Sequence, residues 1–123
     1  EPKLLFTCLD RFSEGGLKLN FYDLVWNLLP FERHYPRSNR NIHKPERFNE
    51  MISYAKALAK PFPFVRVDLY EWNERVYFGE LTFFPGGGIE DFQPESVDFE
   101  LGSLLTLPPK SDPWGILLSQ KDL

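Results

Sequence analysis

The chain has 123 residues, and 14 Lys and Arg against 18 Asp and Glu leave a formal net charge of −4 with His neutral. This length suits one domain with one modest core, and the mildly acidic balance gives no support to general nucleic-acid binding. Hydrophobic residues make up 42% and charged residues 26%, which is ordinary globular usage and argues against intrinsic disorder. No stretch approaches the roughly 20 apolar residues of a membrane-spanning helix.

The single cysteine, Cys8, cannot form an internal disulfide or a cysteine metal cluster. Its neighbours Leu5, Phe6 and Leu9 are apolar, so we expect a buried thiol on a strand. A nucleophilic role for this thiol is the less favoured interpretation.

The first third of the chain predicts a β-hairpin. Residues 3–12 and 17–26 are both rich in apolar and strand-forming types, and Gly15 and Gly16 lie between them where the chain reverses. Residues 27–44, which contain two prolines, are expected to be irregular.

The next element is an amphipathic helix. Pro45 suits the first helical position, Glu46 suits the positive N-terminal end, and Pro61 stops the helix. Apolar side chains recur at spacings of three and four and predict a face that packs against the core, made of Phe48, Met51, Ile52, Ala55, Leu58 and Ala59.

Residues 64–71 and 76–83 predict a second hairpin, because apolar and polar residues alternate in both runs. Two pairings are open. A two-residue turn pairs Trp72 with Arg75, whereas a three-residue loop or a bulge pairs Trp72 with Val76.

The second pairing places Asp68 opposite Glu80 and gathers the apolar residues on the other face, namely Val65, Val67, Leu69, Tyr77, Leu81 and Phe83. We favour it because a slip of one residue would move every side chain to the opposite face. Arg66 and Thr82 then join the two carboxylates in one polar cluster.

Two carboxylates about 5 Å apart at Cβ repel each other, so a cation must compensate. Arg66 compensates in part, and a salt-bridged cluster on a solvent face is the simplest interpretation. A divalent cation compensates better, because Mg²⁺ binds oxygen and commonly takes one or two carboxylates together with substrate phosphates. The residues alone leave both interpretations open.

Three glycines at 86–88 follow this hairpin, and a short amphipathic helix is expected near 95–106. We therefore predict an α+β fold, with an antiparallel sheet of about four strands and one or two helices packed on it. Residues 1–109 form the domain and 110–123 a C-terminal tail.

Two other features carry binding chemistry. Residues 33–47 hold five Lys or Arg, two His and one acid. Such a segment suits an anionic polymer or a phosphate, although a solvated loop is the simpler interpretation. Trp26, Trp72 and Trp114 could each stack on a sugar ring, but packing is the default for an amphipathic ring.

The segment FVRVDLYEWNERVYFGELTFFPGGG, residues 64–88, resembles the C-terminal motif of the ATP-grasp superfamily and, more closely, that of the TupA-like ATP-grasp family. ATP-grasp ligases carry an Arg-x-Asp on one strand, then Glu-x-Asn, then Pro-Gly. The corresponding segments here are 66–68, 80–82 and 85–88. The blocks NFYD, FPFVRVD and LGSLLTLP extend the resemblance over most of the chain, from about residue 4 to 108.

The resemblance implies that Asp68 and Glu80, with Thr82, hold the Mg²⁺ that bridges the ATP phosphates. Arg66 is then a catalytic and cofactor-binding residue that steadies the γ-phosphate or an acyl-phosphate intermediate. Phosphoryl transfer depends mainly on positioning and charge neutralisation, which suits these residue types. Thr82 stands where the wider superfamily has Asn, which makes a second Mg²⁺ less secure.

The resemblance also assigns Gly86 and Gly87 to cofactor binding. A glycine loop lets backbone N–H groups approach an oxyanion. A plain turn is the alternative interpretation of the same residues.

By resemblance, the chain is the C-terminal part of a ligase or transferase that acts in the cytoplasm, or at the inner face of the membrane, in exopolysaccharide or cell-surface glycan synthesis. The upstream half of such enzymes supplies the lid, the phosphate-binding lysines and the adenine pocket, and we expect it to be missing here. The chain alone should then bind Mg²⁺ and ATP weakly and be catalytically incompetent.

The expected partners are the missing N-terminal half or another protein chain, with a glycan or amino-acid-like acceptor. We also expect self-association through the face that the missing half would otherwise cover. The alternative function is a non-catalytic accessory or binding module of a polysaccharide biosynthesis system.

Overall fold

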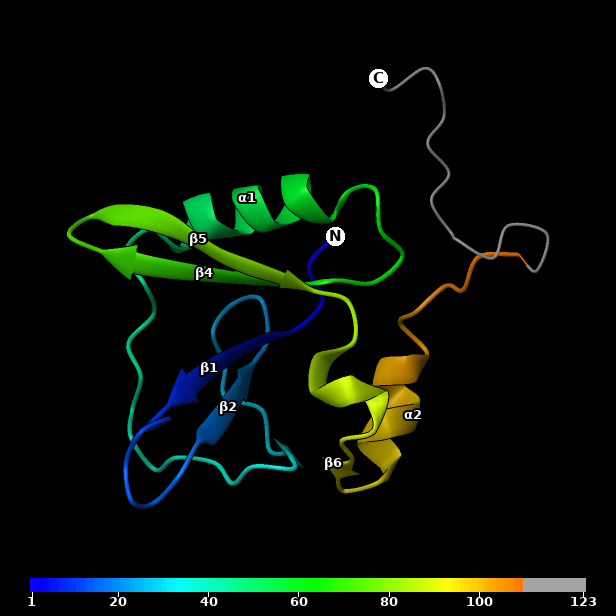
Figure 1. The fold of residues 1–123 in the computed structure, drawn as a ribbon, viewed down its shortest axis with the longest axis horizontal. Coiled ribbons are helices and arrows are strands. Elements are labelled where there is room, and N and C mark those ends of the chain that lie inside the picture. The colour runs from blue at the N-terminus through cyan, green and yellow to red at the C-terminus, as the bar shows by residue number, and fades with distance from the viewer. Residues whose placement is uncertain (110–123) are drawn as a thin grey trace. The chain divides into compact units, whose positions relative to one another are not determined.

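The computed structural model describes residues 1–109 and divides into two compact units (Figure 1). The first, here called the hairpin–helix unit, contains Glu1, Pro45–Pro85 and, of the described residues, 105–109. The second, here called the aromatic unit, contains Pro2–Lys44 and Gly86–Leu104. The predicted tail, residues 110–123, lies outside the described residues.

Two helices and small antiparallel sheets confirm the predicted α+β class. The strands within residues 1–109 form three two-stranded sheets, however, and not one sheet of about four. The pairs are β1 (Leu5–Leu9) with β2 (Lys18–Tyr22), β3 (Glu32–Arg33) with β6 (Phe92–Gln93), and β4 (Arg66–Trp72) with β5 (Arg75–Thr82). Strands β3 and β6 have two residues each, too few for a periodicity to be recognised in the sequence.

Neither helix of the described chain combines the length and the apolar run that crossing a membrane requires. This agrees with the absence of a long apolar stretch in the sequence.

The predicted N-terminal hairpin is confirmed, with shorter strands. β1 and β2 are antiparallel, and Phe6 pairs with Phe21. The strand ends at Leu9 because Asp10 has a positive φ of 58° and its carbonyl accepts a hydrogen bond from the Ser13 N–H at 3.0 Å.

Phe21 is the centre of the core of the aromatic unit. It is 1% exposed, and its ring lies 5.5 Å from that of Phe6, 4.9 Å from Phe31 and 5.8 Å from Phe92, measured between centroids. Tilted and edge-on contacts at these distances suit the quadrupoles of aromatic rings. Three separate segments are therefore joined through one side chain.

Cys8 is exposed, so the prediction of a buried thiol is wrong. Cys8 pairs with the buried Leu19, but it lies one residue before the end of β1, whereas Phe6 pairs with Phe21 at the core. Apolar neighbours in the sequence do not bury a side chain at the end of a two-stranded sheet.

The predicted helix is α1 (Phe48–Ala59), which packs against β4 (Figure 1). Phe48 is buried and Leu58 is 37% exposed, while the rest of the predicted apolar face is half-buried. Pro45 lies three residues before the helix, where its carbonyl accepts a hydrogen bond from the Phe48 N–H at 3.2 Å.

The N-terminus of α1 is held by a carboxylate from the hairpin. Glu71 Oε1 accepts a hydrogen bond from the Arg47 N–H at 3.0 Å, and Oε2 accepts one from the Glu46 N–H at 3.1 Å. Arg47 gives no side-chain cap of its own. A strand residue thus satisfies backbone donors that the start of a helix leaves unpaired, and its charge suits the positive end of the helix.

The β4–β5 hairpin combines the two pairings that the sequence left open. At the turn, Trp72 pairs with Arg75 across Asn73 and Glu74, whose φ angles of 49° and 59° fit a type I′ turn. The predicted pairing of Trp72 with Val76 is therefore wrong. At the other end, Arg66 pairs with Thr82 and Val67 with Leu81, as the favoured pairing requires.

A β-bulge accounts for the difference. Between the Val67–Leu81 and Leu69–Phe78 pairs, β4 contributes only Asp68, whereas β5 contributes Gly79 and Glu80. The extra residue returns Glu80 to the face of Asp68.

The bulge also corrects the predicted apolar face. Tyr77 pairs with Tyr70, on the same side as Asp68, and Phe78 takes its place opposite Leu69. Both Tyr70 and Tyr77 are exposed, at 60% and 45%. The predicted face is thus right near Val67 and wrong beyond the bulge.

The second helix, α2 (Ser96–Gly102), is shorter than the predicted 95–106. Val97 is 6% exposed and belongs to the core of the aromatic unit. After Gly102 the chain leaves the helix, and Ser103 Oγ donates to the Glu100 carbonyl at 2.6 Å.

Candidate functional site

Four of the predicted site residues lie together at the open end of the β4–β5 hairpin. Arg66 and Asp68 belong to β4, and Glu80 and Thr82 to β5. We call this group the Arg66 cluster. Alternation along each strand and the bulge at 79–80 place all four side chains on one face.

Arg66 is the centre of this cluster. Its Nε donates to Asp68 Oδ1 at 2.7 Å and its Nη2 to Asp68 Oδ2 at 2.8 Å, which is a bidentate pair. The same Nη2 donates to Glu80 Oε1 at 2.7 Å, and Thr82 Oγ1 donates to that oxygen at 3.2 Å. One guanidinium therefore connects both carboxylates, and the hydroxyl orients the second.

The charges in the cluster do not cancel. One guanidinium faces two carboxylates, which leaves one net negative charge within the cluster. The side chain of Asp68 is 25% exposed and that of Glu80 is 62% exposed, so both can be reached from solvent. The arrangement can attract and hold a further cation.

The donor set fits Mg²⁺ in chemical type. It offers two carboxylates and a hydroxyl, all oxygen ligands, and Mg²⁺ commonly takes one or two carboxylates and completes its shell with water and phosphate oxygens. Among residues 1–109 no group of three or more His, Cys, Asp or Glu side chains could hold a metal by itself. A cation here would be only partly enclosed by the described residues, and it would replace Arg66 as the neighbour of at least one carboxylate.

The two predicted glycine residues belong to the other unit, in a short 3₁₀ segment, η1 (Pro85–Gly88). Gly86 and Gly87 have φ angles of 61° and 67°, which favour glycine. A Cβ on Gly86 would overlap the side chain of Glu90, whose Oε2 lies 3.1 Å from Arg33 Nε. Close packing against this ion pair is a structural reason for glycine at position 86. Cofactor binding by the loop stays a prediction.

A second candidate region, which the sequence did not predict, lies in the aromatic unit. An open pocket of about 680 Å³ lies between the turn after β2 and the loop 37–42. Its lining includes Tyr22 and Trp26 together with Arg37 and Arg40. The basic segment and the tryptophan, which the sequence presents as unrelated features, thus meet in one place.

Asp23 organises the turn on one side of this pocket. Its Oδ1 accepts hydrogen bonds from the backbone N–H of Asn27 at 2.8 Å and of Val25 at 3.0 Å, and its Oδ2 accepts one from Asn27 Nδ2 at 2.8 Å. The bond from the Asn27 backbone, followed by smaller contributions from the other donors of this turn, lowers the pKa of Asp23 below its usual value, against the opposing effect of burial.

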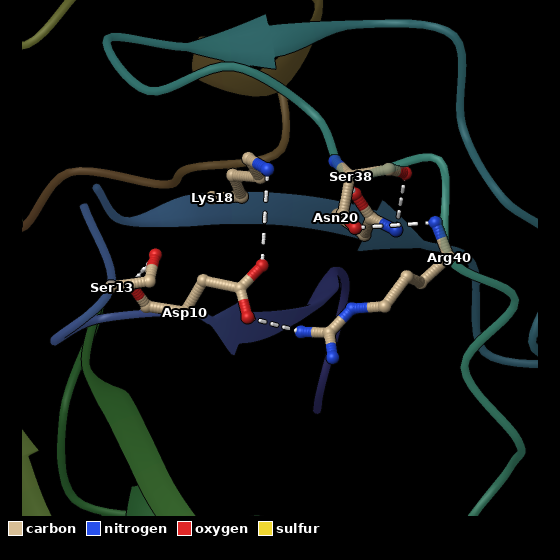
Figure 2. Close-up of polar contacts among 6 residues, drawn as sticks. All are labelled: Asp10, Ser13, Lys18, Asn20, Ser38 and Arg40. Atoms are coloured by element: carbon tan, nitrogen blue, oxygen red, sulfur yellow. Dashed lines mark hydrogen bonds and ion pairs between the residues drawn. The ribbon is translucent and has the colours of Figure 1, made fainter. Parts of the chain in front are cut away.

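Asn20 holds the loop on the other side. This side chain is fully buried, donates to the Ser38 carbonyl at 3.2 Å and accepts from the Ser38 N–H at 2.8 Å (Figure 2). The Leu19 N–H adds a bond to the Pro36 carbonyl at 3.1 Å. A buried amide that pairs with both groups of one backbone residue fixes the loop on β2.

A family model described as TupA-like ATPgrasp matches residues 2–106 of the chain. No curated protein and no solved structure shows a significant match. The match includes both the Arg66 cluster and the pocket of the aromatic unit.

Proposed function

Since the chain belongs to the TupA-like ATP-grasp family, we propose that Asp68 and Glu80, assisted by Thr82, bind the Mg²⁺ of Mg-ATP. The chain would then be the C-terminal part of a cytoplasmic ligase or transferase of exopolysaccharide or cell-surface glycan synthesis. The observation that carries this proposal is the bulge at 79–80, which places the two carboxylates on one face around Arg66.

Each residue of the cluster has a role that its contacts support. Bound Mg²⁺ would supply charge neutralisation on the phosphates during transfer. Asp68 and Glu80 would hold the ion, and the bond from Thr82 fixes the Glu80 oxygen that faces the cluster. Arg66 would keep one bond to a carboxylate and turn its remaining donors to a phosphate oxygen, because a guanidinium matches carboxylate and phosphate equally well.

The reaction class proposed is transfer of the γ-phosphoryl group of ATP to a carboxylate, which releases ADP. An amine then attacks the acyl phosphate, forms an amide and displaces phosphate. Such chemistry also needs groups that enclose the adenine and the outer phosphates. We propose that a preceding segment or another protein chain supplies them, and that the acceptor is a glycan or an amino-acid-like molecule.

A non-catalytic accessory module is the second candidate. The observation that favours it is the bidentate bond between Arg66 and Asp68, which already gives each Asp68 oxygen a partner without any metal. In that case the cluster stabilises the open end of the hairpin and nothing more.

Titration with Mn²⁺, followed by the electron paramagnetic resonance of the free ion, separates the two candidates. We expect the chain to remove Mn²⁺ from solution, more strongly with ATP present, and Mg²⁺ to compete. Asp68→Asn should abolish this uptake, whereas Asp91→Asn, the same change at an exposed aspartate in the other unit, should leave it unchanged. Equal uptake by both variants would contradict the assignment.

A further inference from the structure

The pocket of the aromatic unit carries an inference of its own. It measures about 680 Å³, within the range of small-molecule sites, and its lining contains no Asp or Glu. We propose that it binds a sugar that carries an anionic group, either a carboxylate or a phosphate. Trp26 supplies the aromatic surface, and the buried Tyr22 supports its ring from behind. Arg37 and Arg40 supply the cations, and Asn39 and Asn41 the amides.

The aromatic side of the pocket is held in an unusual conformation. Trp26 has a φ of 73°, which a bulky residue rarely adopts. Its ring stacks on Tyr22, with centroids 4.5 Å apart and planes inclined by 14°, and its Nε1 donates to the Ile42 carbonyl at 3.0 Å. The bonds around Asp23 compensate for the strained backbone, and strain that the surroundings maintain is typical of binding sites.

The opposite side of the pocket is equally fixed. Asn20 holds Ser38, and Ser38 Oγ accepts a hydrogen bond from the Arg40 N–H at 3.2 Å (Figure 2). With the Trp26 bond to Ile42, the loop is attached at both of its ends. A preorganised pocket of this kind loses little conformational entropy when a ligand binds.

The charge of the lining is positive. Among the described residues that line the pocket, the charged ones are Arg37 and Arg40. Arg40 pairs at 2.5 Å with Asp10, which also lies 3.8 Å from Lys18, and neither Asp10 nor Lys18 lines the pocket (Figure 2). Arg37 lies 3.7 Å from Glu32, which does not line the pocket. Arg40 is 58% exposed at its side chain, so its guanidinium can meet a ligand from solvent.

The neutral groups favour a sugar over a bare anion. Within the described residues the side chains of Asn39 and Asn41 make no hydrogen bond, and each amide offers donors and an acceptor. Hydroxyl groups of a sugar use both kinds of group, whereas phosphate or a carboxylate alone uses only donors. The apolar face of a sugar ring suits an aromatic wall.

This inference rests on the proposed function, for which it names an anionic sugar as the class of acceptor or donor. Its test needs neither metal nor nucleotide. Backbone and indole NMR shifts of the 123-residue chain are followed while glucuronate, glucose 1-phosphate, glucose, inorganic phosphate or ATP is added without Mg²⁺. Saturable shifts at Trp26 and Asn41 with an anionic sugar support the proposal. Comparison of glucuronate with glucose 1-phosphate distinguishes a preference for a carboxylate from a preference for a phosphate.

Two variants test the contribution of charge. Arg37→Gln should weaken binding of the anionic sugar at least tenfold, because the substitution removes a charge-assisted hydrogen bond to the anionic group. Arg75→Gln, the same change at an exposed arginine of β5, should leave it unchanged. Asp68→Asn should also leave it unchanged, which separates this proposal from the metal assignment.

Three results would overturn the proposal. Glucose binding as tightly as glucuronate would exclude a role for the cations. Phosphate alone binding as tightly as glucose 1-phosphate would reduce the pocket to an anion site. ATP shifting the pocket while no sugar does would assign it to a nucleotide instead.

Discussion

The ring of Tyr70 lies over Gly79 in the β4–β5 hairpin. A Cβ at position 79 would come within 2.6 Å of Tyr70 Cε2 and 3.0 Å of the Asp68 carbonyl oxygen. A side chain at position 79 therefore requires this ring to move and crowds the backbone of Asp68. Gly79 is one of the two residues whose bulge brings Glu80 to the face of Asp68. A side-chain contact on the exposed face thus accompanies the geometry of the proposed metal site.

Gly79→Ala should disrupt both the hairpin and the cluster. The added methyl group meets backbone as well as a ring, so we expect a loss of about 1–3 kcal/mol in unfolding free energy, as for other overpacked sites. Urea unfolding measures this loss, and Mn²⁺ uptake should fall with it. Gly102→Ala is the matched control, because a Cβ there has no neighbour within 4 Å. Equal stability of the two variants would show that the bulge tolerates a side chain.

Glu71→Ala should loosen the start of α1. The substitution removes both acceptors of the Glu46 and Arg47 N–H groups, and loss of a helix cap costs about 0.5–2 kcal/mol. Amide hydrogen exchange in the first turn of α1 should accelerate accordingly. Glu14→Ala, at an exposed position of the β1–β2 loop, should leave that exchange unchanged. Unchanged exchange in Glu71→Ala would mean that water replaces the carboxylate at no cost.

Asn20→Ala should destabilise the aromatic unit. The Ser38 N–H and carbonyl would lose their buried partner, and an unsatisfied buried group costs about 1–3 kcal/mol. Chemical unfolding followed by near-ultraviolet circular dichroism measures the effect. Asn39→Ala, at an exposed position of the loop that contains Ser38, should change stability by less than about 0.5 kcal/mol. The interpretation fails if the two alanine variants unfold at the same urea concentration.

The turn at Asp23 should depend on acidity. The pKa of Asp23 is lowered from 3.8 in the folded chain, mainly by the hydrogen bond from the Asn27 backbone. A carboxyl group with a depressed folded-state pKa stabilises the fold at pH values above its unfolded pKa, and this contribution is lost as the pH falls through the folded value. We therefore expect the Trp26 indole N–H resonance to hold its position down to about pH 4 and to move below it. In Asp23→Asn this movement of the resonance with pH should be absent. A movement that persists would assign the titration to another group.

The sequence predicted the elements better than their ends and pairings. The stripe of apolar residues in α1 and the alternation in β4 are local patterns, and both lie where expected. The bulge could not be located, because it depends on how the two strands pair, which the pattern within each strand does not determine. The role of Glu71 could not be predicted either, because its partner at the start of α1, Arg47, lies 24 positions earlier in the sequence.

The Arg66 cluster could be predicted because alternation puts Arg66 with Asp68 and Glu80 with Thr82. The register that the apolar pattern favours then puts both pairs on one face near the open end of the hairpin. The pocket of the aromatic unit could not, because it depends on a buried amide, Asn20, that attaches an irregular loop to β2. Asparagine in a strand gives no such signal in the sequence. The NFYD block contains both Asn20 and Asp23, so one short motif positions both sides of the pocket.

We propose that the carboxylates on the bulged hairpin bind the metal of Mg-ATP. The most direct test is paramagnetic broadening of the isotope-labelled chain by substoichiometric Mn²⁺, recorded with and without ATP. We expect signals of the Arg66 cluster, namely Arg66, Asp68, Glu80 and Thr82, to broaden first, and ATP to strengthen the effect. Broadening spread over the exposed acids of both units, or none near residue 68, would contradict it and leave the cluster as a salt bridge that stabilises the hairpin.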